Sequence, residues 1–338
     1  MKIDVLYQFN EKYAPFAGVS MTSLFENNKH FDEIRVFILG EEIEECSKNK
    51  LVQLARQYQR EILFLSIDPL IEMMKQWNMP TYRGSYAANA RLFLNEIVPE
   101  DVDKLLYLDA DTIVAGKLNE LFEMEMGDYP IAMALDSLVR KHKLRLGYQN
   151  QSYYFNSGVI VFQMRNWKKG KYSEKIANHV KTIRAHYPSP DQDLLNIVCR
   201  NRIKLLKPQF NLQPIHLAFS LADYFRWFCR TGYYQVEEIR EAKEKPIIFH
   251  FFRFVGEFPW NKDNVHPDKE LFDCYLKISP WRDFEKAPTD NNLIFRIEKE
   301  MYKRIPRSLF IVFFKVAYEF FIWKSNKDSL KKKINKIM

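Results

Sequence analysis

The feature that most restricts the fold of this chain is an apolar run that ends abruptly in two carboxylates. Residues 105–111 read Leu-Leu-Tyr-Leu-Asp-Ala-Asp, and such an unbroken run is typical of a strand buried inside an α/β sheet. Open α/β sheets bind their ligands where the strands end. Two buried carboxylates are costly to ionise without a cation between them, so we expect Asp109 and Asp111 to hold a divalent metal. This metal would share its oxygen ligands with substrate phosphates.

Two further Asp-x-Asp pairs show that the motif alone is weak evidence, because most such pairs belong to solvated turns. Asp101 and Asp103 precede the apolar strand and are expected at the surface. Asp191 and Asp193 stand at the start of an expected short helix, where acidic residues are favourable. What sets Asp109 and Asp111 apart is the apolar strand before them, because ligands bind at the ends of such strands.

The first half of the chain alternates between strand and helix patterns, which predicts a largely parallel, doubly wound sheet covered by helices. Strands are predicted at residues 3–7, 34–39, 62–67, 105–109, 131–135, 158–163 and 247–251. Helices are predicted at residues 15–26, 41–59, 86–97 and 167–184, followed by a short helix from Asp191. The polar segment at residues 279–292 contains two prolines and is the expected boundary between this domain and a C-terminal tail.

Charge and cysteine content exclude several classes of protein. The net charge of the 338-residue chain is +8, but residues 301–338 hold ten Lys or Arg against two acids, so the first 300 residues balance 41 basic and 41 acidic side chains. Nucleic-acid readers usually carry their basic surface on the folded domain, so we expect no nucleic-acid partner. Four widely spaced cysteines favour a reducing compartment and argue against a zinc or disulfide framework. No secretory signal is visible, which predicts a cytoplasmic protein.

Six short motifs follow one another along the chain: Asn10-x-x-Tyr13, Ala90-Arg91-Leu92, Leu106-Tyr107-Leu108-Asp109-Ala110-Asp111, Tyr154-Phe155-Asn156-Ser157-Gly158-Val159, Asp191-Gln192-Asp193, and His250 with Pro259-Trp260. In this order and spacing they resemble the family 8 glycosyltransferases, which are retaining enzymes similar to bacterial lipooligosaccharide galactosyltransferases and glycogenin. The resemblance covers residues 1–265. It implies a GT-A fold, with a single Rossmann-like mixed α/β sheet flanked by helices, and a catalytic domain at residues 1–280 followed by a helical tail.

The resemblance implies that Asp109, Asp111 and His250 bind Mn²⁺ or Mg²⁺ together with the diphosphate of a UDP-sugar. Two carboxylates and an imidazole suit manganese, and diphosphate oxygens complete an octahedral shell. A metal in this position acts as a Lewis acid on the departing UDP. The implied function is the metal-dependent, retaining transfer of galactose or glucose from a UDP-hexose to a surface-glycan oligosaccharide or glycolipid acceptor.

The same resemblance implies which residues bind the nucleotide. An aromatic face suits a flat base, so Tyr13 is expected to stack on uracil, with Asn10 at the uracil edge and Gln8 beside it. The implied nucleotide-binding residues are Gln8, Asn10, Tyr13, Arg83, Arg91, Asp109, Ala110, Asp111 and Gly256.

Catalytic roles fall, by the same resemblance, to Arg91, Asn156, Asp191 and Gln192. Gln192 is expected below the anomeric carbon, on the face opposite the leaving group. Retention then follows either from front-side attack guided by the departing phosphate or from a short-lived adduct with Gln192 or Asp191, and both routes stay open. Asp136, after the strand at residues 131–135, is either an acceptor contact or a simple cap of that strand.

The chain departs from the family at its last motif, which usually reads His-x-x-Gly-x-x-Lys-Pro-Trp with the lysine on the diphosphate. Here the stretch from His250 to Trp260 is longer, and Phe258 stands where the lysine is expected. Arg253 and Arg83 are the nearest replacement cations. Without a replacement the phosphate charge would be under-compensated, so an inactive UDP-sugar-binding homologue is one alternative.

A sugar-nucleotide nucleotidyltransferase is a second alternative, because that class is built on a related sheet. Such enzymes need a glycine-rich basic loop after the first strand. In this chain the corresponding residues 8–13 contain no glycine. The sequence therefore favours the glycosyltransferase interpretation over this one.

The tail at residues 293–338 combines an apolar, aromatic stretch at residues 309–323 with basic flanks. Its longest uninterrupted apolar run is far below the ~20 residues needed to cross a bilayer. The pattern is typical of a helix lying in the plane of an anionic membrane, where each basic residue adds about 1 kcal/mol. It predicts a peripheral protein on the inner face of a bacterial plasma membrane. Docking of the helix on its own domain or across a dimer is the alternative.

Overall fold

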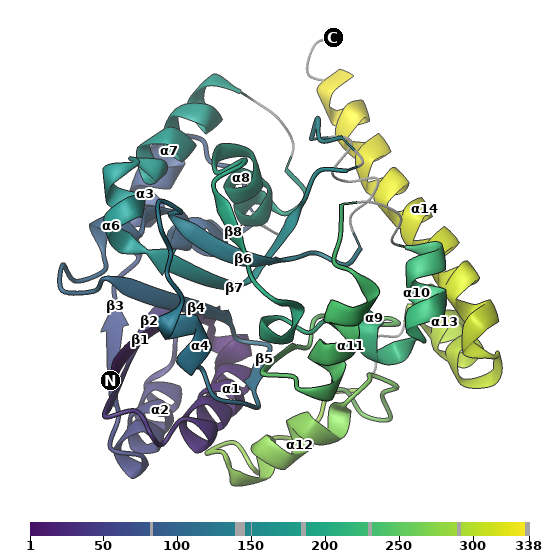
Figure 1. The fold of residues 1–338 in the computed structure, drawn as a ribbon, viewed down its shortest axis with the longest axis horizontal. Helices are drawn as coiled ribbons and strands as arrows, with labels where there is room; N and C mark the ends of the chain where they lie inside the picture. The colour runs from purple at the N-terminus through teal and green to yellow at the C-terminus, as the bar shows by residue number, and fades with distance from the viewer. Residues whose placement is uncertain are drawn as a thin grey trace.

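The structure is a computed structural model that describes residues 1–81, 84–138, 146–149, 151–183, 187–228, 232–288 and 292–334, with side chains described as far as residue 320. Its centre is a mixed sheet (Figure 1). The strands lie in the order β3 (Glu61–Leu65), β2 (Glu33–Glu41), β1 (Lys2–Asn10), β4 (Lys104–Asp109), β7 (Phe155–Gln163), β6 (Ile131–Leu135) and β8 (Ile203–Leu205).

Strand directions divide this sheet into two parts. The strands β1 to β4 pair in parallel, whereas β7 runs antiparallel to both β4 and β6. At the far edge β8 is parallel to β6. The predicted mixed α/β sheet flanked by helices is thus confirmed, and the acidic end of β4 lies at its centre.

Helices cover both faces of the sheet because successive side chains of a strand point to opposite faces. In β1, Val5 and Tyr7 pack into one apolar core and Leu6 into the other. The first face carries α1 (Ala14–Asn27), α2 (Glu45–Gln57) and α12 (Lys269–Ile278). The second face carries α3 (Asp68–Gln76), the 3-10 helix η2 (Ala87–Glu96), α6 (Met164–Lys169), α7 (Tyr172–Thr182) and α8 (Pro190–Val198).

Shorter helices connect these layers to the C-terminal region. They are η1 (Glu11–Tyr13), α4 (Asn119–Glu123), η3 (Pro208–Phe210), α9 (Pro214–Ala218), α10 (Leu221–Trp227) and α11 (Val236–Glu244).

A second, two-stranded sheet was not fully anticipated from the sequence. It pairs β5 (Thr112–Val114) with β9 (Ile248–His250) in antiparallel fashion, and Thr112 lies opposite His250. The last strand was predicted, but β5, which directly follows the acidic turn, was not. This pairing brings His250 beside Asp111, although more than a hundred residues separate them in the chain.

The segment ahead of β4 differs from the predicted α-helix at residues 86–97. It forms the tighter helix η2, with non-helical backbone at Phe93. Gln8 of β1 fixes η2 at both ends of one turn: its amide nitrogen donates to the Ala87 carbonyl, and its amide oxygen accepts from the Arg91 N–H. The position of Gln8 at the end of β1 therefore determines where Arg91 lies.

The predicted helix at residues 167–184 is also wrong in its extent. It is divided into α6 and α7, which separate at Gly170 and Lys171, and Lys171 adopts a left-handed φ of 51°. Arg184, the expected last residue, lies outside the described residues. The start of α2 at Glu45 rather than at residue 41 has a simple cause, because β2 continues as far as Glu41.

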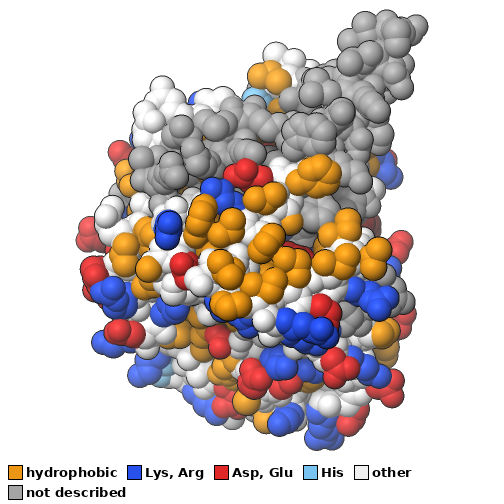
Figure 2. All heavy atoms as spheres, turned by 90° about the vertical axis from the view of Figure 1, so that its right-hand side faces the viewer, with side chains coloured by type: hydrophobic (Ala, Val, Ile, Leu, Met, Phe, Trp, Pro, Cys, Tyr) orange, Lys and Arg blue, Asp and Glu red, His pale blue; other side chains and the backbone are white. Residues whose placement is uncertain are grey.

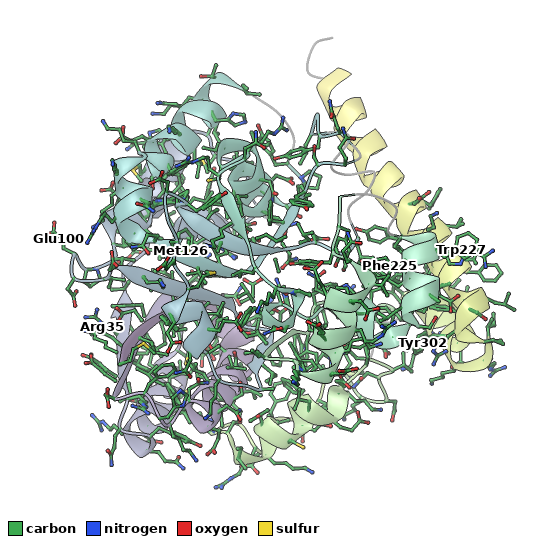
Figure 3. All side chains as sticks on the ribbon, viewed as in Figure 1. Arg35, Glu100, Met126, Phe225, Trp227 and Tyr302 are labelled. Atoms are coloured by element: carbon green, nitrogen blue, oxygen red, sulfur yellow. The ribbon has the colours of Figure 1, made fainter. Side chains whose placement is uncertain are left out.

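The C-terminal tail forms two helices, α13 (Leu293–Arg304) and α14 (Arg307–Ile334), along one side of the molecule (Figure 1). Phe310, Ile311 and Phe314 of α14 are buried in an apolar cluster with side chains of α9 and α10. Figure 3 shows Phe225 and Trp227 of α10 beside α14. One side of the helix therefore docks on its own domain, as one of the two alternatives predicted.

The other side of α14 is largely exposed. Leu309, Phe313, Val316 and Phe320 are 53–63% exposed. No helix in the ranges that the structure describes has both the length and the apolar character that a bilayer crossing requires.

Candidate active site

The predicted metal ligands converge at the carboxyl end of β4. One ligand atom from each of Asp109, Asp111 and His250 lies within 4.8 Å of the others. His250 Nε2 is 3.3 Å from Asp111 Oδ1 and 3.6 Å from Asp109 Oδ2. The backbone holds this arrangement as well, since the Phe251 N–H donates to the Asp111 carbonyl at 2.7 Å. Two carboxylates and an imidazole form a donor set that fits Mn²⁺ or Mg²⁺.

His250 is held in one orientation by hydrogen bonds behind the triad. Its Nδ1 lies 3.1 Å from Asn211 Oδ1, and the Asn211 amide nitrogen donates to Asn156 Oδ1 at 2.9 Å. Because the Asn211 oxygen can only accept, Nδ1 carries a proton, and Nε2, on the side of the carboxylates, is left to bind either a cation or a second proton. Metal-binding histidines are usually oriented by such an outer hydrogen bond.

Gly158 provides the room that the imidazole occupies. A Cβ atom at this position would come within 2.1 Å of His250 Cε1 and 2.5 Å of Nδ1. Any side chain here would therefore push the ring away from Asp109 and Asp111. The glycine belongs to β7, the strand adjacent to β4, so the main sheet and the β5–β9 pair jointly define the site.

The electrostatic field at His250 favours a positive charge. Burial alone would lower the pKa of His250, but the nearby carboxylates of Asp111 and Asp109 outweigh it, and the pKa lies above its ordinary value. The same field would stabilise a bound cation. A divalent ion would compete with the imidazole proton for Nε2.

Arg91 links the metal-binding end to the second acidic cluster. Its guanidinium is 3.1 Å from Asp109 Oδ1 and 3.5 Å from Asp191 Oδ2, and it lies over the Tyr107 ring with 4.0 Å to the centroid. Burial acts to lower the pKa of Arg91, whereas Tyr107 and the two aspartates raise it, with a net upward shift. Arg91 is therefore a fixed positive charge between two carboxylates, one of which is the strand-end Asp109.

Asp191 and Gln192 begin α8 and point to the end of β7. Asp191 Oδ2 accepts from the Ser157 hydroxyl at 3.0 Å, and Gln192 Oε1 accepts from the Ser157 N–H at 2.9 Å. Burial raises the pKa of Asp191, and the Arg91 guanidinium opposes this rise. Both side chains are thus fixed by β7, although the sequence placed them on a separate element.

Asp136 accepts hydrogen bonds from two side-chain amides of the site. Its Oδ2 accepts from the Asn156 amide at 3.1 Å and from the Gln192 amide at 3.2 Å. The Gln192 amide also lies 3.3 Å from the Tyr154 hydroxyl. A plain strand cap would not make these contacts, so Asp136 is part of the same hydrogen-bonded network as Gln192.

These groups line one cavity of about 850 Å³. The following predicted residues line it: Gln8, Asn10, Tyr13, Arg91, Asp109, Ala110, Asp111, Asn156, Asp191, Gln192 and His250. The cavity thus contains the base-binding, metal-binding and catalytic residues that the sequence predicted, in one continuous space. Its size is within the range of small-molecule sites in proteins, about 300–1,000 Å³.

Two predicted residues are not placed in the cavity. Gly256 has a φ of +74° and packs against Phe295, which a Cβ atom would approach to 2.5 Å, and it is not among the lining residues. Arg83 lies outside the described residues. Gly256 therefore has a structural reason to be glycine that does not involve a ligand.

The position of the expected phosphate lysine is occupied by an aromatic stack. Phe258 stacks on Trp260 with ring centroids 4.6 Å apart, and the Arg253 guanidinium lies 5.3 Å from the centroid of Phe258. Arg253 lines the cavity, and so does Lys12 of η1, which the sequence interpretation did not consider. Lys12 follows the end of β1 within the nucleotide motif, and that position was the available signal.

The cavity carries an excess of negative charge. Among its described lining residues, five are carboxylates and three are Lys or Arg. A free nucleotide diphosphate would be repelled by this surface, whereas a diphosphate complexed with a divalent cation would be accepted. The charge balance therefore favours binding of an anionic substrate together with a metal.

Solved structures with a similar chain path identify the fold class. The galactosyltransferase LgtC in complex with donor and acceptor sugar analogues superimposes with a TM-score of 0.66 at 23% identity, over 83% of this chain and 99% of that chain. The apo form of the glycosyltransferase GlyE of Streptococcus pneumoniae TIGR4 gives a TM-score of 0.59 at 21% identity, over 86% of this chain and 66% of that one. The mixed sheet with its acidic strand end is the GT-A fold, as predicted.

The chain belongs to glycosyl transferase family 8, whose family model matches residues 4–264. It is therefore a glycosyltransferase, and the family predicted from the six motifs is confirmed. The match does not support the nucleotidyltransferase alternative.

Curated relatives lie at similar distances from this chain. Lipopolysaccharide 1,2-glucosyltransferase of Escherichia coli K12 is 24% identical over 90% of this chain and 85% of its own length. Lipopolysaccharide 1,3-galactosyltransferase of Salmonella typhimurium is 24% identical over 83% and 79%. General stress protein A of Bacillus subtilis is 23% identical over 80% and 92%.

Proposed function

We propose that this protein is a metal-dependent, retaining hexosyltransferase that moves galactose or glucose from a UDP-hexose to an oligosaccharide or glycolipid acceptor. The observation that carries the proposal is the convergence of Asp109, Asp111 and His250 at one end of an acidic cavity. These three residues would hold Mn²⁺ or Mg²⁺ together with the donor diphosphate. When bound, the ion supplies Lewis-acid stabilisation of the charge on the departing UDP.

The nucleotide end of the cavity has groups for each part of UDP. Tyr13 offers an aromatic face for the uracil ring, and Asn10 offers both a donor and an acceptor for its edge. Gln8 acts differently from the prediction, because both ends of its amide are used by η2. It positions Arg91 and lines the cavity without a free amide group of its own.

Arg253 and Lys12 supply the positive charge that the missing lysine would bring. Both line the cavity, and Arg253 lies beside Phe258, which occupies the lysine position. A guanidinium can bind phosphate oxygens through two parallel hydrogen bonds. Replacement of one clamp cation by others argues against the inactive-homologue alternative.

The transfer end contains Arg91, Asn156, Asp191 and Gln192. Arg91 is paired with both Asp109 and Asp191, so it maintains a fixed distance between the metal ligands and the sugar-binding acid. Gln192 is held by Ser157 and Asp136, which leaves its side chain little freedom to move. Such preorganisation lowers the reorganisation needed when the glycosidic bond breaks. It serves front-side attack and adduct formation equally.

The exposed side of the tail supports a membrane-bound acceptor. Figure 2 shows a band of hydrophobic side chains on the face that carries α13 and α14. The exposed apolar side chains of these two helices are Leu293, Ile294, Ile297, Leu309, Phe313, Val316 and Phe320. Ten Lys or Arg in residues 301–338 accompany them. An apolar face with basic surroundings fits an anionic lipid surface, and we infer a peripheral position on the inner face of a bacterial plasma membrane.

The relatives named for lipopolysaccharide chemistry agree with such an acceptor. Two of them transfer glucose or galactose to lipopolysaccharide according to their names. A growing surface polysaccharide or lipooligosaccharide would present its sugars at a membrane surface. We therefore place the acceptor of this enzyme in the same class.

A donor screen tests the proposal. The full chain is incubated with MnCl₂ and a panel of UDP-sugars, and released UDP is measured. We expect release from UDP-galactose or UDP-glucose that stops when EDTA removes the metal. The anomer formed first, observed by proton NMR, should keep the α configuration of the donor. Binding of UDP without release from any donor would support the inactive homologue. Formation of pyrophosphate from UTP and a hexose 1-phosphate would support a nucleotidyltransferase.

A further inference from the structure

The inward side of α14 continues from the domain core into the active-site cavity. Phe310, Phe314 and Tyr318 are spaced four residues apart, so they lie along one side of the helix. The first two are buried among the side chains of α9 and α10. The third, Tyr318, lines the cavity. The tail helix therefore forms part of the wall of the active site.

Tyr318 is supported from behind by this aromatic stripe. Its ring stacks on Phe314 at 6.4 Å between centroids, with an interplanar angle of 19°. Phe314 in turn packs on Phe219, Phe228 and Phe254. A ring fixed in this way loses little conformational entropy when a ligand binds to it.

Tyr318 is near an acidic residue of the transfer end. Leu138, Phe252 and Tyr318 all line the cavity, and Asp136 is close enough for its charge to act on the Tyr318 phenol. Asp136 is hydrogen-bonded to the Gln192 amide at 3.2 Å. Tyr318 therefore borders the place where the hexose is transferred, whereas the base-binding residues Asn10 and Tyr13 come from β1 and η1.

The Tyr318 hydroxyl remains neutral at physiological pH. Burial raises the pKa of Tyr318 above its ordinary value, and the negative charge of Asp136 adds to this. A neutral phenol can both donate and accept a hydrogen bond, while a carboxylate only accepts. Tyr318 and Asp136 together offer an aromatic face, one donor and several acceptors.

This combination matches a sugar ring, which presents an apolar C–H face and hydroxyl groups at its edge. We propose that Tyr318 is an acceptor-binding residue, which holds a saccharide acceptor against Asp136 and so makes α14 part of the acceptor site. The inference rests on the proposed function and extends it. It assigns α14 two tasks, since its outward side would meet the lipid surface that carries the acceptor.

Kinetics of three variants test this assignment. Tyr318→Ala removes the ring, Tyr318→Phe removes only the hydroxyl, and Phe313→Ala alters the exposed side of the same helix as a control. For each variant, the rate of hydrolysis of UDP-galactose and UDP-glucose, measured as released UDP, gives the donor KM. The rate of sugar transfer from the better donor to lactose, maltose and the methyl glycosides of glucose and galactose gives kcat/KM for the acceptor.

We expect Tyr318→Ala to lose about tenfold or more in kcat/KM for the best glycoside, with a donor KM within about twofold of the parent. Tyr318→Phe should lose less, about two- to fivefold, since it keeps the ring. The Phe313→Ala variant should behave like the parent with these soluble acceptors. Thermal unfolding checks that the variants are folded, and Tyr318→Phe keeps the test valid if the alanine variant is unstable.

Two results would overturn the assignment. One is transfer by Tyr318→Ala at the parental rate, and the other is a donor KM that rises by the same factor as kcat/KM for the acceptor falls. If no glycoside of the panel is used, water serves as the smallest acceptor. In that case an at least threefold change in kcat for hydrolysis at constant donor KM is expected, and an unchanged kcat overturns the proposal. A parent chain that releases no UDP at all contradicts the proposed function and not this assignment.

Discussion

The site at the end of β4 buries ionisable side chains, whereas the outer side of α14 exposes large apolar ones. At the site, ionisable side chains are withdrawn from water: His250 is 4% exposed, and Arg91 and Asp191 are 7% exposed. On α14, Phe313 is 53% and Val316 is 63% exposed. Charged groups are rarely buried without partners, and large apolar groups rarely cluster at a surface without one. Each region therefore matches the chemistry of the ligand proposed for it, a cation in one case and a lipid surface in the other.

The two regions also differ in how firmly they are held. At the site, His250 and Asp191 are held by hydrogen bonds with Asn211 and Ser157. The outer side of α14 is mostly exposed, and the buried residues on the inward side of the same helix anchor it to the domain. Substitutions should accordingly affect chemistry in one region, and stability or surface binding in the other.

The largest effect is expected at the metal ligands. Asp111→Asn or Asp109→Ala removes a carboxylate that the divalent ion requires, so UDP release should fall by about a thousandfold or more. Calorimetry should show that Mn²⁺-dependent UDP binding is lost as well. Asp103→Asn, in the exposed Asp-x-Asp pair, is the matched control and should retain full activity. Parental UDP release by either triad variant would refute the site.

Next in size is the contrast between neighbouring phenylalanines of α14. Phe314→Ala empties a buried position and should lower the free energy of unfolding by about 3 kcal/mol, whereas Phe313→Ala should change it by less than about 0.5 kcal/mol. Urea denaturation measures both. In sedimentation with vesicles rich in phosphatidylserine the order should reverse, with about a tenfold weaker binding for Phe313→Ala. Equal vesicle binding by that variant and the parent would exclude this face as the membrane contact.

A smaller effect is expected from the hydrogen bond behind His250. Asn211→Ala leaves all three ligands in place but frees the imidazole, and the loss of such outer partners typically weakens metal affinity by about 10–100-fold. Titration of UDP binding with Mn²⁺ measures this change. Asn166→Ala, at a half-buried position that does not line the cavity, should leave the affinity unchanged. An unaltered Mn²⁺ affinity in Asn211→Ala would show that the imidazole is oriented by packing alone.

The smallest effect is a loss of stability at low pH that is caused by the buried His216. His216 of α9 accepts the Gln213 N–H at Nδ1 and contacts the Tyr233 hydroxyl through Nε2. Burial lowers the pKa of His216 to about 3. In the unfolded chain the His216 side chain binds a proton near pH 6.5, whereas in the folded protein it stays neutral. The free energy of unfolding therefore has its full value above pH 6.5 and falls as the pH drops below it. At pH 5.5 the loss should be about 1.4 kcal/mol.

His216→Asn keeps a side-chain acceptor and removes the titration, so its urea midpoint should be flat between pH 7.5 and 5.5. If the parent and the variant lose the same stability over this range, another group causes the loss. His216 also lies between the two regions, because Gln213 at the start of α9 accepts from the N–H of Ser137, the neighbour of Asp136, and α9 packs with Phe310 of the tail cluster.

Local patterns were sufficient to predict much of the fold and the site. The apolar run of β4 and its two aspartates were readable because strand burial and strand-end chemistry are local in sequence. The features that escaped prediction depend on contacts between distant segments. The pairing of Thr112 with His250 is one example, and the 3-10 geometry of η2, imposed by Gln8 from β1, is another.

Residues beyond the family motifs were missed for the same reason. Asn211 lies in a short irregular segment and acquires its role only when β9 places His250 beside it. Tyr318 is one of several aromatics in a tail whose docked side the sequence left undecided. Gly158 was recognised as part of a motif, but the structure is needed to see why it is glycine: a Cβ atom there would collide with the His250 imidazole.

Under the proposed function, the short pairing of β5 with β9 makes metal binding a test of correct strand alignment. Side chains alternate along β9, with Phe249 toward the core and His250 toward the carboxylates. A slip by one residue would exchange the two, because the side-chain period of a strand is two. A molecule misaligned in this way could remain compact while lacking a third ligand. The fraction of a preparation that binds the ion would thus report how many chains have assembled in the correct register.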